Sequence, residues 1–323
     1  MQAAFALFDE DDENEPIGST SEGTSTSSLP IPTPAITQLK SLQERVTVQL
    51  EEAEQHTTAQ PHAAFSETTH NACVSVLRRH GVLLLKGLFD PALILEWRSR
   101  VLADMDVALA AVPASADRTT LRYKELASRQ AARFEVRNGA QMKAGEAQGQ
   151  AAVLSEHPGV VRVILEAFAC PGQAPLPLSD MRAWRDVGAF VSLPGATAQQ
   201  LHADLDHLFF SGPHLPPHYV TMFLPALTPD DGALDPRVGQ TEFFPGTHTV
   251  AAAAKVLNGE TAPSISPQLQ AGDAVLYDAR LLHRGLGNSS KSTRRPILYV
   301  NFQRSWFEDQ QNWGQESVFD ASK

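Results

Sequence analysis

Cysteine is nearly absent from the sequence, with Cys73 and Cys170 as the two copies in 323 residues. They form no metal-ligand spacing, and they fit a reducing compartment as small buried hydrophobic residues. No apolar run approaches the length that spans a membrane. The N-terminal MQAAFALFDEDDENEP lacks the basic region of a signal peptide, and the last three residues do not spell the peroxisomal Ser-Lys-Leu signal. We therefore expect a cytoplasmic protein, with the nucleus as the alternative, and no membrane contact.

A surplus of basic residues is also absent. The chain carries 26 Lys and Arg against 37 Asp and Glu, a formal net charge of −11. Residues 1–60 hold 11 of the acidic side chains and only 2 of the basic ones, so the rest of the chain is nearly neutral. Because no basic stripe is available to meet phosphates, we expect no nucleic-acid partner.

The first 36 residues are acidic, then rich in Ser and Thr, then rich in Pro. They cannot bury enough apolar surface to offset the entropy of ordering, so we expect a disordered tail. Phe5, Leu7 and Phe8 beside the acidic run form a candidate motif for a protein partner. The simpler interpretation is a tail that only solvates the protein.

The remaining chain divides into a helical first half and a β-rich second half. Apolar residues at helical spacing predict a helical lead-in over 37–66, and further helices are expected at 67–79, 91–112 and 158–168 around a strand at 82–89. From about residue 181, short apolar runs alternate with Pro and Gly breaks, which indicates an antiparallel sandwich or barrel. The domain is expected to span 67–310, with a C-terminal tail at 311–323.

The stretch QQLHADLDHLFF places four groups that can bind a metal close together, namely His202, Asp204, Asp206 and His207. On an extended strand residues i and i+2 share a face, so His202 and Asp204 would offer an imidazole and a carboxylate to one ion. Two histidines and one carboxylate hold non-heme Fe(II) with open sites. The alternative is a helix with its polar residues facing solvent, although the nearby Pro and Gly residues favour a strand or loop.

Four segments follow one another in a characteristic order: PGATAQQLHAD (194–204), QTEFFPGTH (240–248), GDAVLYDARLLHRGLGN (272–288) and RPILYVNF (295–302). With these motifs the chain resembles the phytanoyl-CoA dioxygenase (PhyH) family of Fe(II)/2-oxoglutarate-dependent oxygenases. The joint order is more specific than any single motif. The resemblance implies an α+β fold with a double-stranded β-helix core, also called jelly-roll or cupin-like, and flanking N-terminal helices.

Residue by residue, the resemblance makes His202, Asp204 and His283 the iron ligands and the catalytic centre. An arginine just past His283 would anchor the distal carboxylate of 2-oxoglutarate, because a guanidinium grips a carboxylate in bidentate fashion. Family spacing selects Arg294, whereas strand alternation selects Arg295, which we favour. Phe223 is expected to line the co-substrate pocket.

Other polar residues near these motifs have less specific interpretations. We expect Asp206 and His207 to support the ligands or line the pocket wall. His248, which follows a tight turn, fits a hydrogen-bonded loop residue better than a fourth ligand. Arg129, Arg133 and Arg137, spaced by four, are expected on the solvent face of a helix rather than in a pocket for an anionic substrate.

The chemistry implied by the resemblance uses Fe(II), 2-oxoglutarate and O2, and it releases succinate and CO2 while hydroxylating a small organic substrate. Relatives that halogenate lack the carboxylate that Asp204 supplies, so hydroxylation is expected. The sequence does not identify the substrate. Two other functions fit part of the pattern: a zinc or manganese isomerase or hydrolase on a cupin-like barrel, and a non-catalytic scaffold.

Overall fold

The computed structural model describes residues 41–50, 64–137, 152–183, 188–209, 211, 213–308 and 316–320. The chain divides into two units, Met1–Leu39 and Lys40–Lys323, and every described residue belongs to the second unit. The tail expected at 1–36 and most of the one expected at 311–323 lie outside the described residues. No described helix is long and apolar enough to cross a membrane.

The expected helical lead-in is only partly helical. Helix α1 spans Leu42–Val46 and is followed directly by strand β1, Thr47–Gln49, which pairs in parallel with β2, Val82–Lys86. The expected helix through residues 47–49 is therefore wrong. Val46, Val48 and Leu50 are buried at alternate positions, which is the period of a strand, and β-branched side chains fit a strand better than a helix.

The other expected helices are present. Helix α2, Glu67–His80, ends at Gly81, whose φ of 69° is the left-handed conformation that glycine adopts most readily. Helix α3, Pro91–Ala111, begins with Asp90 as its cap and Pro91 in its first turn, and α5 spans Pro158–Ala167. A shorter helix, α6, covers Val250–Leu257.

One large sheet organises the described residues. Its strand order is β1-β2-β9-β7-β11-β6-β4-β3, with β5 paired to the far end of β11. Besides β1 and β2, its strands are β3 (Leu126–Gln130), β4 (Arg133–Val136), β5 (Met181–Ala183), β6 (Gly188–Ser192), β7 (Tyr219–Pro225), β9 (Ala274–Asp278) and β11 (Arg295–Arg304). All pairs other than β1–β2 are antiparallel.

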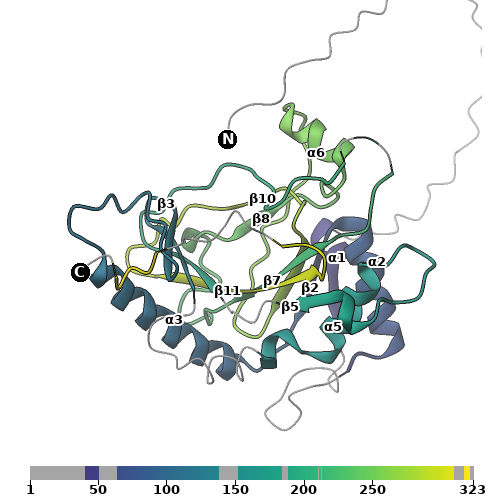
Figure 1. Cartoon of the computed structure of the whole chain (residues 1–323), viewed down its shortest axis with the longest axis horizontal. Helices are drawn as coiled ribbons and strands as arrows, with labels where there is room; N and C mark the ends of the chain where they lie inside the picture. The colour runs from purple at the N-terminus through teal and green to yellow at the C-terminus, as the bar shows by residue number, and fades with distance from the viewer. Residues whose placement is uncertain are drawn as a thin grey trace, which may run out of the picture. The chain divides into compact units, whose positions relative to one another are not determined.

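A second, smaller sheet consists of β8, Thr241–Phe243, and β10, His283–Gly285. Isolated bridges extend it, joining His202 to His283 on one side and Phe243 to Ile265 on the other. This small sheet lies above β11 in Figure 1, while α3 and α5 lie below it. Two facing sheets with helices on the outer face of the larger one form the expected jelly-roll core of an α+β protein.

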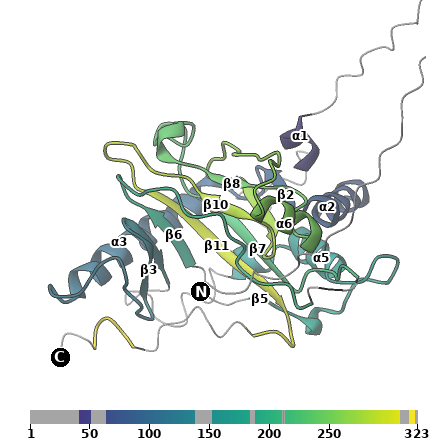
Figure 2. The same cartoon turned by 90° about the horizontal axis from the view of Figure 1, so that it is seen from above.

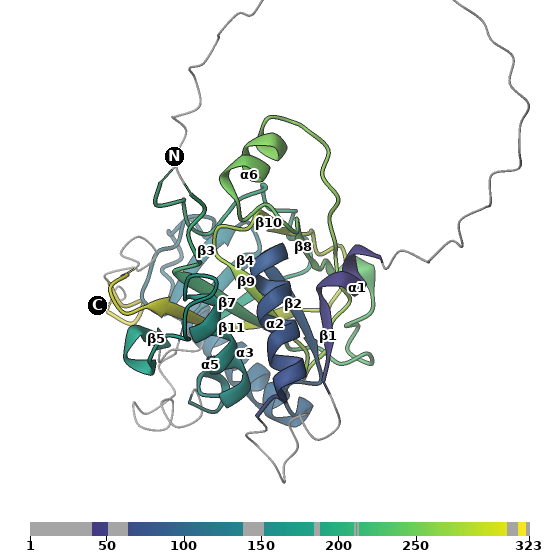
Figure 3. The same ribbon diagram turned by 90° about the vertical axis from the view of Figure 1, so that its right-hand side faces the viewer.

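The two faces of the large sheet have different surroundings. Leu298, Val300 and Phe302 of β11 belong to the main hydrophobic core, together with residues of α2, α3 and α5. Figure 2 shows α3 beside β3, and Figure 3 shows α2 and α5 side by side. Ile297 and Tyr299 project to the opposite face, toward the small sheet, where Phe243 of β8 joins them. The cavity described below lies on this second face.

Candidate functional site

Two histidines come together where the chain before β7 pairs with β10. His202 and His283 exchange backbone hydrogen bonds, with N···O distances of 3.1 and 2.9 Å. Residues paired directly across an antiparallel bridge project to the same side, and the two imidazole centroids lie 4.6 Å apart. The pairing thus brings together two histidines that are 81 positions apart in the sequence.

Asp204 completes a compact group with these histidines. Its backbone N–H donates to the carbonyl of Ala279 over 2.9 Å, which folds the segment back over the sheet. Oδ1 of Asp204 lies 3.8 Å from Nε2 of His202 and 3.6 Å from Nε2 of His283. One ligand atom from each of the three residues lies within 4.8 Å of the others, and no other such group occurs within the described ranges.

Each imidazole is oriented by its other ring nitrogen. Nδ1 of His202 lies 2.8 Å from the carbonyl of Gln200, and Nδ1 of His283 lies 3.0 Å from that of Leu281. A backbone carbonyl can only accept, so Nδ1 of each ring carries a proton, and Nε2 is the nitrogen that faces Asp204. Burial lowers the pKa of His283, with Asp204 opposing the shift and His202 adding to it. His283 is therefore neutral at pH 7, as a metal ligand must be.

Tyr277 of β9 supports the carboxylate. Its hydroxyl donates to Oδ2 of Asp204 over 2.7 Å, and the side chain is 1% exposed. Burial, followed by the negative charge of Asp204, raises the pKa of Tyr277 well above its usual value, so it remains a donor. Oδ2 is thereby occupied, and Oδ1 is left to face the two histidines.

This donor set fits one small transition-metal ion. Two imidazole nitrogens and one carboxylate oxygen on one side of an ion leave its opposite positions open to other molecules. Hydrogen-bonded partners behind all three ligands are what such sites need to hold their ligands in place. The same three donors also suit zinc. The other residues that line the cavity therefore indicate which metal the site uses.

A cavity of about 640 Å³ extends from the three ligands along the sheet. Phe223 of β7, expected to line a co-substrate pocket, is in its wall. So are Arg295, Ile297, Tyr299 and Asn301 of β11. The alternation of faces predicted for this strand is therefore present, with the apolar residues between them packed under the helices.

Arg295 belongs to a row of buried polar residues that crosses three strands. It pairs with Ser192 of β6, which pairs in turn with Arg133 of β4, so all three side chains project to the cavity face. Arg133 is 3% exposed, Arg295 5% and Ser192 1%. Within the described chain, Oγ of Ser192, Nε and Nη1 of Arg295, and Nε of Arg133 have no hydrogen-bond partner.

Among the described residues, neither Arg133 nor Arg295 is paired with a carboxylate. Burial lowers the pKa of Arg295 to about 9, with the positive charge of Arg133 contributing, and burial alone lowers that of Arg133 to about 10. Both remain charged at pH 7. Buried charges without partners are costly, so a row of this kind indicates the binding of an anion. Sequence reasoning did not place Arg133 in the pocket, and it did not single out Ser192.

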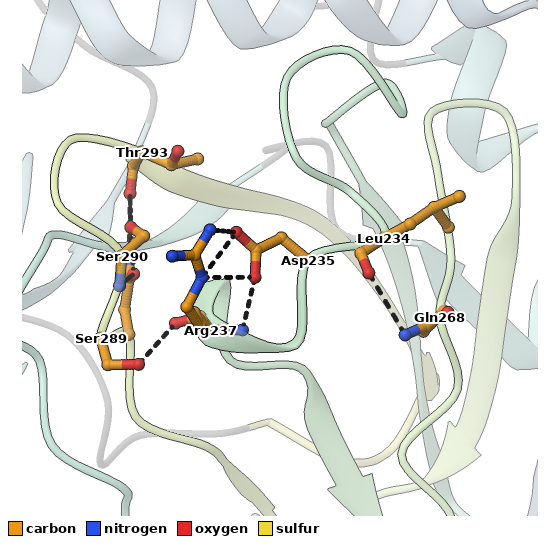
Figure 4. A network of polar contacts seen from close by, with 8 residues as sticks. Leu234, Asp235, Arg237, Gln268, Ser289, Ser290 and Thr293 are labelled. Atoms are coloured by element: carbon orange, nitrogen blue, oxygen red, sulfur yellow. Dashed lines mark hydrogen bonds and ion pairs between the residues drawn. The ribbon is translucent and has the colours of Figure 1, made fainter.

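Arg294 points elsewhere. Its guanidinium donates to Oδ1 of Asp106 in α3 over 2.8 Å, and its side chain is 36% exposed. Figure 4 shows the loop that precedes it, where Ser290 donates to the carbonyl of Thr293 and Ser289 to that of Arg237. Arg237 is itself held by Asp235 over 2.8 Å. These contacts hold the loop before β11 together and tie it to Arg237.

The expectation for Arg129, Arg133 and Arg137 was wrong. They lie on the β3–β4 hairpin and just beyond it, not on a helix, and all three line the cavity. Glu135 of β4 accepts from Arg129 over 2.7 Å, from Arg137 over 3.0 Å and from the hydroxyl of Tyr299 over 2.5 Å. Residues four apart share a face on a strand as well as on a helix, so their spacing did not separate the two.

Asp206 and His207, expected to support the ligands or to line the pocket wall, are not among the residues that line the cavity. Asp206 is exposed, and His207 is one of four histidines whose pKa values respond to the buried Asp278–Arg280 pair, with His214, His218 and His248. The chain after Asp204 is a loop without strand pairing, so alternation of faces does not hold there. His248 lies apart from the ligands, with Nε2 at 3.1 Å from the carbonyl of Arg78.

We expect acid to destabilise the fold through His218 and His248. Burial lowers the pKa of each to about 4, and Nδ1 of each is buried with no hydrogen-bond partner in the described part of the chain. An unfolded histidine binds its proton near pH 6.5, so the unfolded state binds more protons between pH 6.5 and 4. The free energy of unfolding should fall as the pH drops through this window. Urea titrations at several pH values measure how steeply the free energy of unfolding depends on pH. The double variant H218N/H248N should show a shallower dependence.

A model of the phytanoyl-CoA dioxygenase (PhyH) family matches residues 77–296. Among solved structures, the chain is similar to the non-heme α-ketoglutarate-dependent epimerase SnoN from nogalamycin biosynthesis, at 16% identity over 74% of this chain and 84% of that one, with a TM-score of 0.49. It is also similar to the carbocyclase SnoK of the same biosynthesis, at 15% identity over 77% and 87% with a TM-score of 0.48. A third similar structure is AviO1 from Streptomyces viridochromogenes Tue57, at 17% identity over 74% of this chain and 97% of that one, with a TM-score of 0.43. These TM-scores are all below 0.5, so the assignment rests on the family model, which covers more than half of the sequence: the chain belongs to the phytanoyl-CoA dioxygenase family.

Proposed function

We propose that the chain hydroxylates a small organic substrate at an Fe(II) ion held by His202, Asp204 and His283, with 2-oxoglutarate held by Arg295. The coarser statement follows from its family: it is an iron- and 2-oxoglutarate-dependent oxidoreductase. The observation that carries the finer proposal is the pairing of two features in one cavity. A three-residue metal-binding group lies at one part of the wall, and a row of buried donors, several of whose atoms have no hydrogen-bond partner in the described residues, lies at another.

The buried row has the chemistry to hold the distal carboxylate of 2-oxoglutarate. Arg295 offers a planar guanidinium for a bidentate contact, Ser192 offers a hydroxyl, and Arg133 adds a second positive charge. Gly285 leaves room for this arrangement, because a Cβ there would lie 2.4 Å from Nη1 of Arg133. Gly285 is two residues beyond His283 on β10, so the row lies beside the metal-binding group.

Iron and 2-oxoglutarate, when bound, supply oxidative decarboxylation to succinate and CO2 and the insertion of oxygen into a C–H bond. The chain's own residues hold the metal and the co-substrate in position and keep water out of the cavity. The ligands and their hydrogen-bonded partners fix which side of the ion is open. Phe223 and Ile297 contribute apolar surface to the cavity wall, which limits the entry of water.

Iron-loaded protein incubated with 2-oxoglutarate and O2 provides the test. We expect succinate to form in an Fe(II)-dependent manner, and N-oxalylglycine, a 2-oxoglutarate analogue, to inhibit it. Protein loaded with Zn(II) serves as the control and should give none. Tight binding of Zn(II), together with no succinate from the Fe(II) form, would contradict the proposal and indicate a zinc enzyme instead.

Tyr277→Phe is expected to weaken metal binding about tenfold to a hundredfold, the usual loss when a residue supporting a ligand is removed. Without the hydroxyl, Oδ2 of Asp204 is free to turn away from its present geometry. Anaerobic calorimetry with Fe(II) measures the change. Tyr219→Phe removes another hydroxyl from the cavity wall and should leave the affinity unaltered. Equal affinities of the Tyr277→Phe variant and the unaltered protein would show that the contact does not position the carboxylate.

A further inference from the structure

The cavity has room for a substrate beside the five-carbon co-substrate. Its volume of about 640 Å³ lies within the range of pockets that hold drug-sized molecules. The wall formed by β3 and β4 contributes a larger share of charged residues than the β7 and β9 wall, where Thr221, Phe223 and Tyr277 are found. The composition of the charged wall therefore carries information about the substrate.

Positive charge exceeds negative charge among the described residues that line the cavity. The lining contains four arginines and two carboxylates, an excess of two positive charges: Arg129, Arg133, Arg137 and Arg295 against Glu135 and Asp204. The two lining histidines are the proposed ligands and are counted as neutral. Arginine stays charged in proteins even when it is buried, so this excess persists at physiological pH.

The co-substrate does not remove the excess. Of its two carboxylates, one would lie in the row, where it balances only one of the two charges of Arg295 and Arg133. The other would meet the metal, where a divalent ion, Asp204 and that carboxylate sum to zero. One positive charge of the row then remains, because no carboxylate among the described residues pairs with Arg133, whose guanidinium donates to the carbonyls of Thr197 and Leu286. A second anion is needed to balance it.

The hairpin also provides a second oriented cation in the cavity wall, Arg129. Glu135 holds Arg129 and Arg137 together, and the guanidinium of Arg129 lies 5.9 Å from the centroid of the Phe190 ring. Burial alone would lower the pKa of Arg129, but Glu135 raises it, and Asp204 contributes to that rise. Arg129 therefore lines the same cavity as Asp204 of the metal-binding group. Its side chain is 30% exposed, so it is accessible from the cavity.

We propose that the substrate is an organic oxyanion, a carboxylate or a phosphate, whose charged group binds Arg129 at the β3–β4 wall with Arg133 nearby. The rest of the molecule extends over Phe190 toward the three metal ligands, which places a C–H bond rather than the anion at the open side of the ion. This inference rests on the proposed function, because it assigns one of the two anions in the cavity to 2-oxoglutarate.

The test compares three probes of similar size: phenylacetate, phenyl phosphate and the neutral phenylacetamide. Calorimetry measures their binding to Zn(II)-loaded protein in the presence of 2-oxoglutarate. No turnover is expected under these conditions, because zinc is not redox-active. We expect one of the two anions to bind at least tenfold more tightly than the amide, and the better anion identifies the class. Equal binding of all three, including no binding of any, would overturn the proposal.

Variants locate the contact. Arg129→Gln should remove the preference for the anion, and Arg129→Lys should keep part of it, which separates a loss of charge from a loss of fold. Arg284→Gln is the matched control, because Arg284 of β10 pairs with Glu242 and is not in the cavity wall. A preference that persists in Arg129→Gln would overturn the assignment to this residue.

The same samples separate this inference from the proposed function. Failure of metal-loaded protein to bind 2-oxoglutarate counts against the proposed function itself. Normal binding of 2-oxoglutarate, combined with equal affinities for the acid and the amide, leaves that function standing and overturns only the anionic substrate.

Discussion

Asp204→Ala is expected to abolish both tight Fe(II) binding and succinate formation. The substitution removes one of three donors and also leaves the hydroxyl of Tyr277 without its acceptor. Loss of a supporting residue alone typically weakens metal binding tenfold to a hundredfold, so loss of a ligand should exceed that range. Anaerobic calorimetry and a succinate assay on the same preparation measure the two effects.

Asp206→Ala is the control for this experiment. Asp206 is two residues along the same loop, is exposed and does not line the cavity, so both metal affinity and turnover should be retained. Thermal unfolding of metal-free protein should show that both variants fold. In Asp204→Ala the hydroxyl of Tyr277 loses its acceptor, which should lower the free energy of unfolding by about 1–3 kcal/mol at most. If Asp204→Ala kept full activity and Asp206→Ala lost it, the ligand assignment would be wrong.

The sequence predicted those parts of the site that depend on local pattern. The faces of β11 followed from alternation, because Leu298, Val300 and Phe302 are apolar while the residues between them are mixed. Start and stop signals located α2, α3 and α5, through Gly81 at the end of one helix and Pro91 and Pro158 at the start of the others.

The parts that sequence reasoning missed depend on pairing between distant strands. The row of Arg133, Ser192 and Arg295 exists because β6 lies between β4 and β11 in one register, and no local pattern encodes which strands are neighbours. Tyr277 reaches Asp204 for the same reason, since 73 positions separate them. A signal was present at β4, where Arg133, Glu135 and Arg137 alternate with buried Phe134 and Val136.

The structure also explains why a spacing rule and strand alternation disagreed about the two arginines at the start of β11. Counting from His283 measures a loop, and loop length varies easily. The face of a strand is fixed by what packs on either side of it. Arg294 lies just before the strand and reaches Asp106 of α3, on the helix side of the sheet, whereas Arg295 is the first residue of β11 and projects to the cavity.

Arg295→Ala is therefore expected to raise the KM for 2-oxoglutarate tenfold or more. A hydrogen bond to a charged group contributes about 1.5–3 kcal/mol, and 1.4 kcal/mol corresponds to a factor of ten in affinity. The charge of Arg133 remains in the row and should preserve some binding, so activity at saturating 2-oxoglutarate should fall less than the affinity. Arg294→Ala, which removes only a half-exposed ion pair, should change the KM less than twofold.

A second measurement on the Arg295 variant distinguishes a binding role from a structural one. Arg295 and Arg133 are buried like charges, and each lacks an anionic partner among the described residues. Replacing Arg295 with methionine, which is similar in length and uncharged, should relieve their repulsion and raise the melting temperature of the protein without co-substrate. Adding 2-oxoglutarate should stabilise the unaltered protein by mass action and the variant far less. A lower melting temperature of the variant without co-substrate, together with an unchanged KM, would show that Arg295 stabilises the fold and that another residue holds the carboxylate.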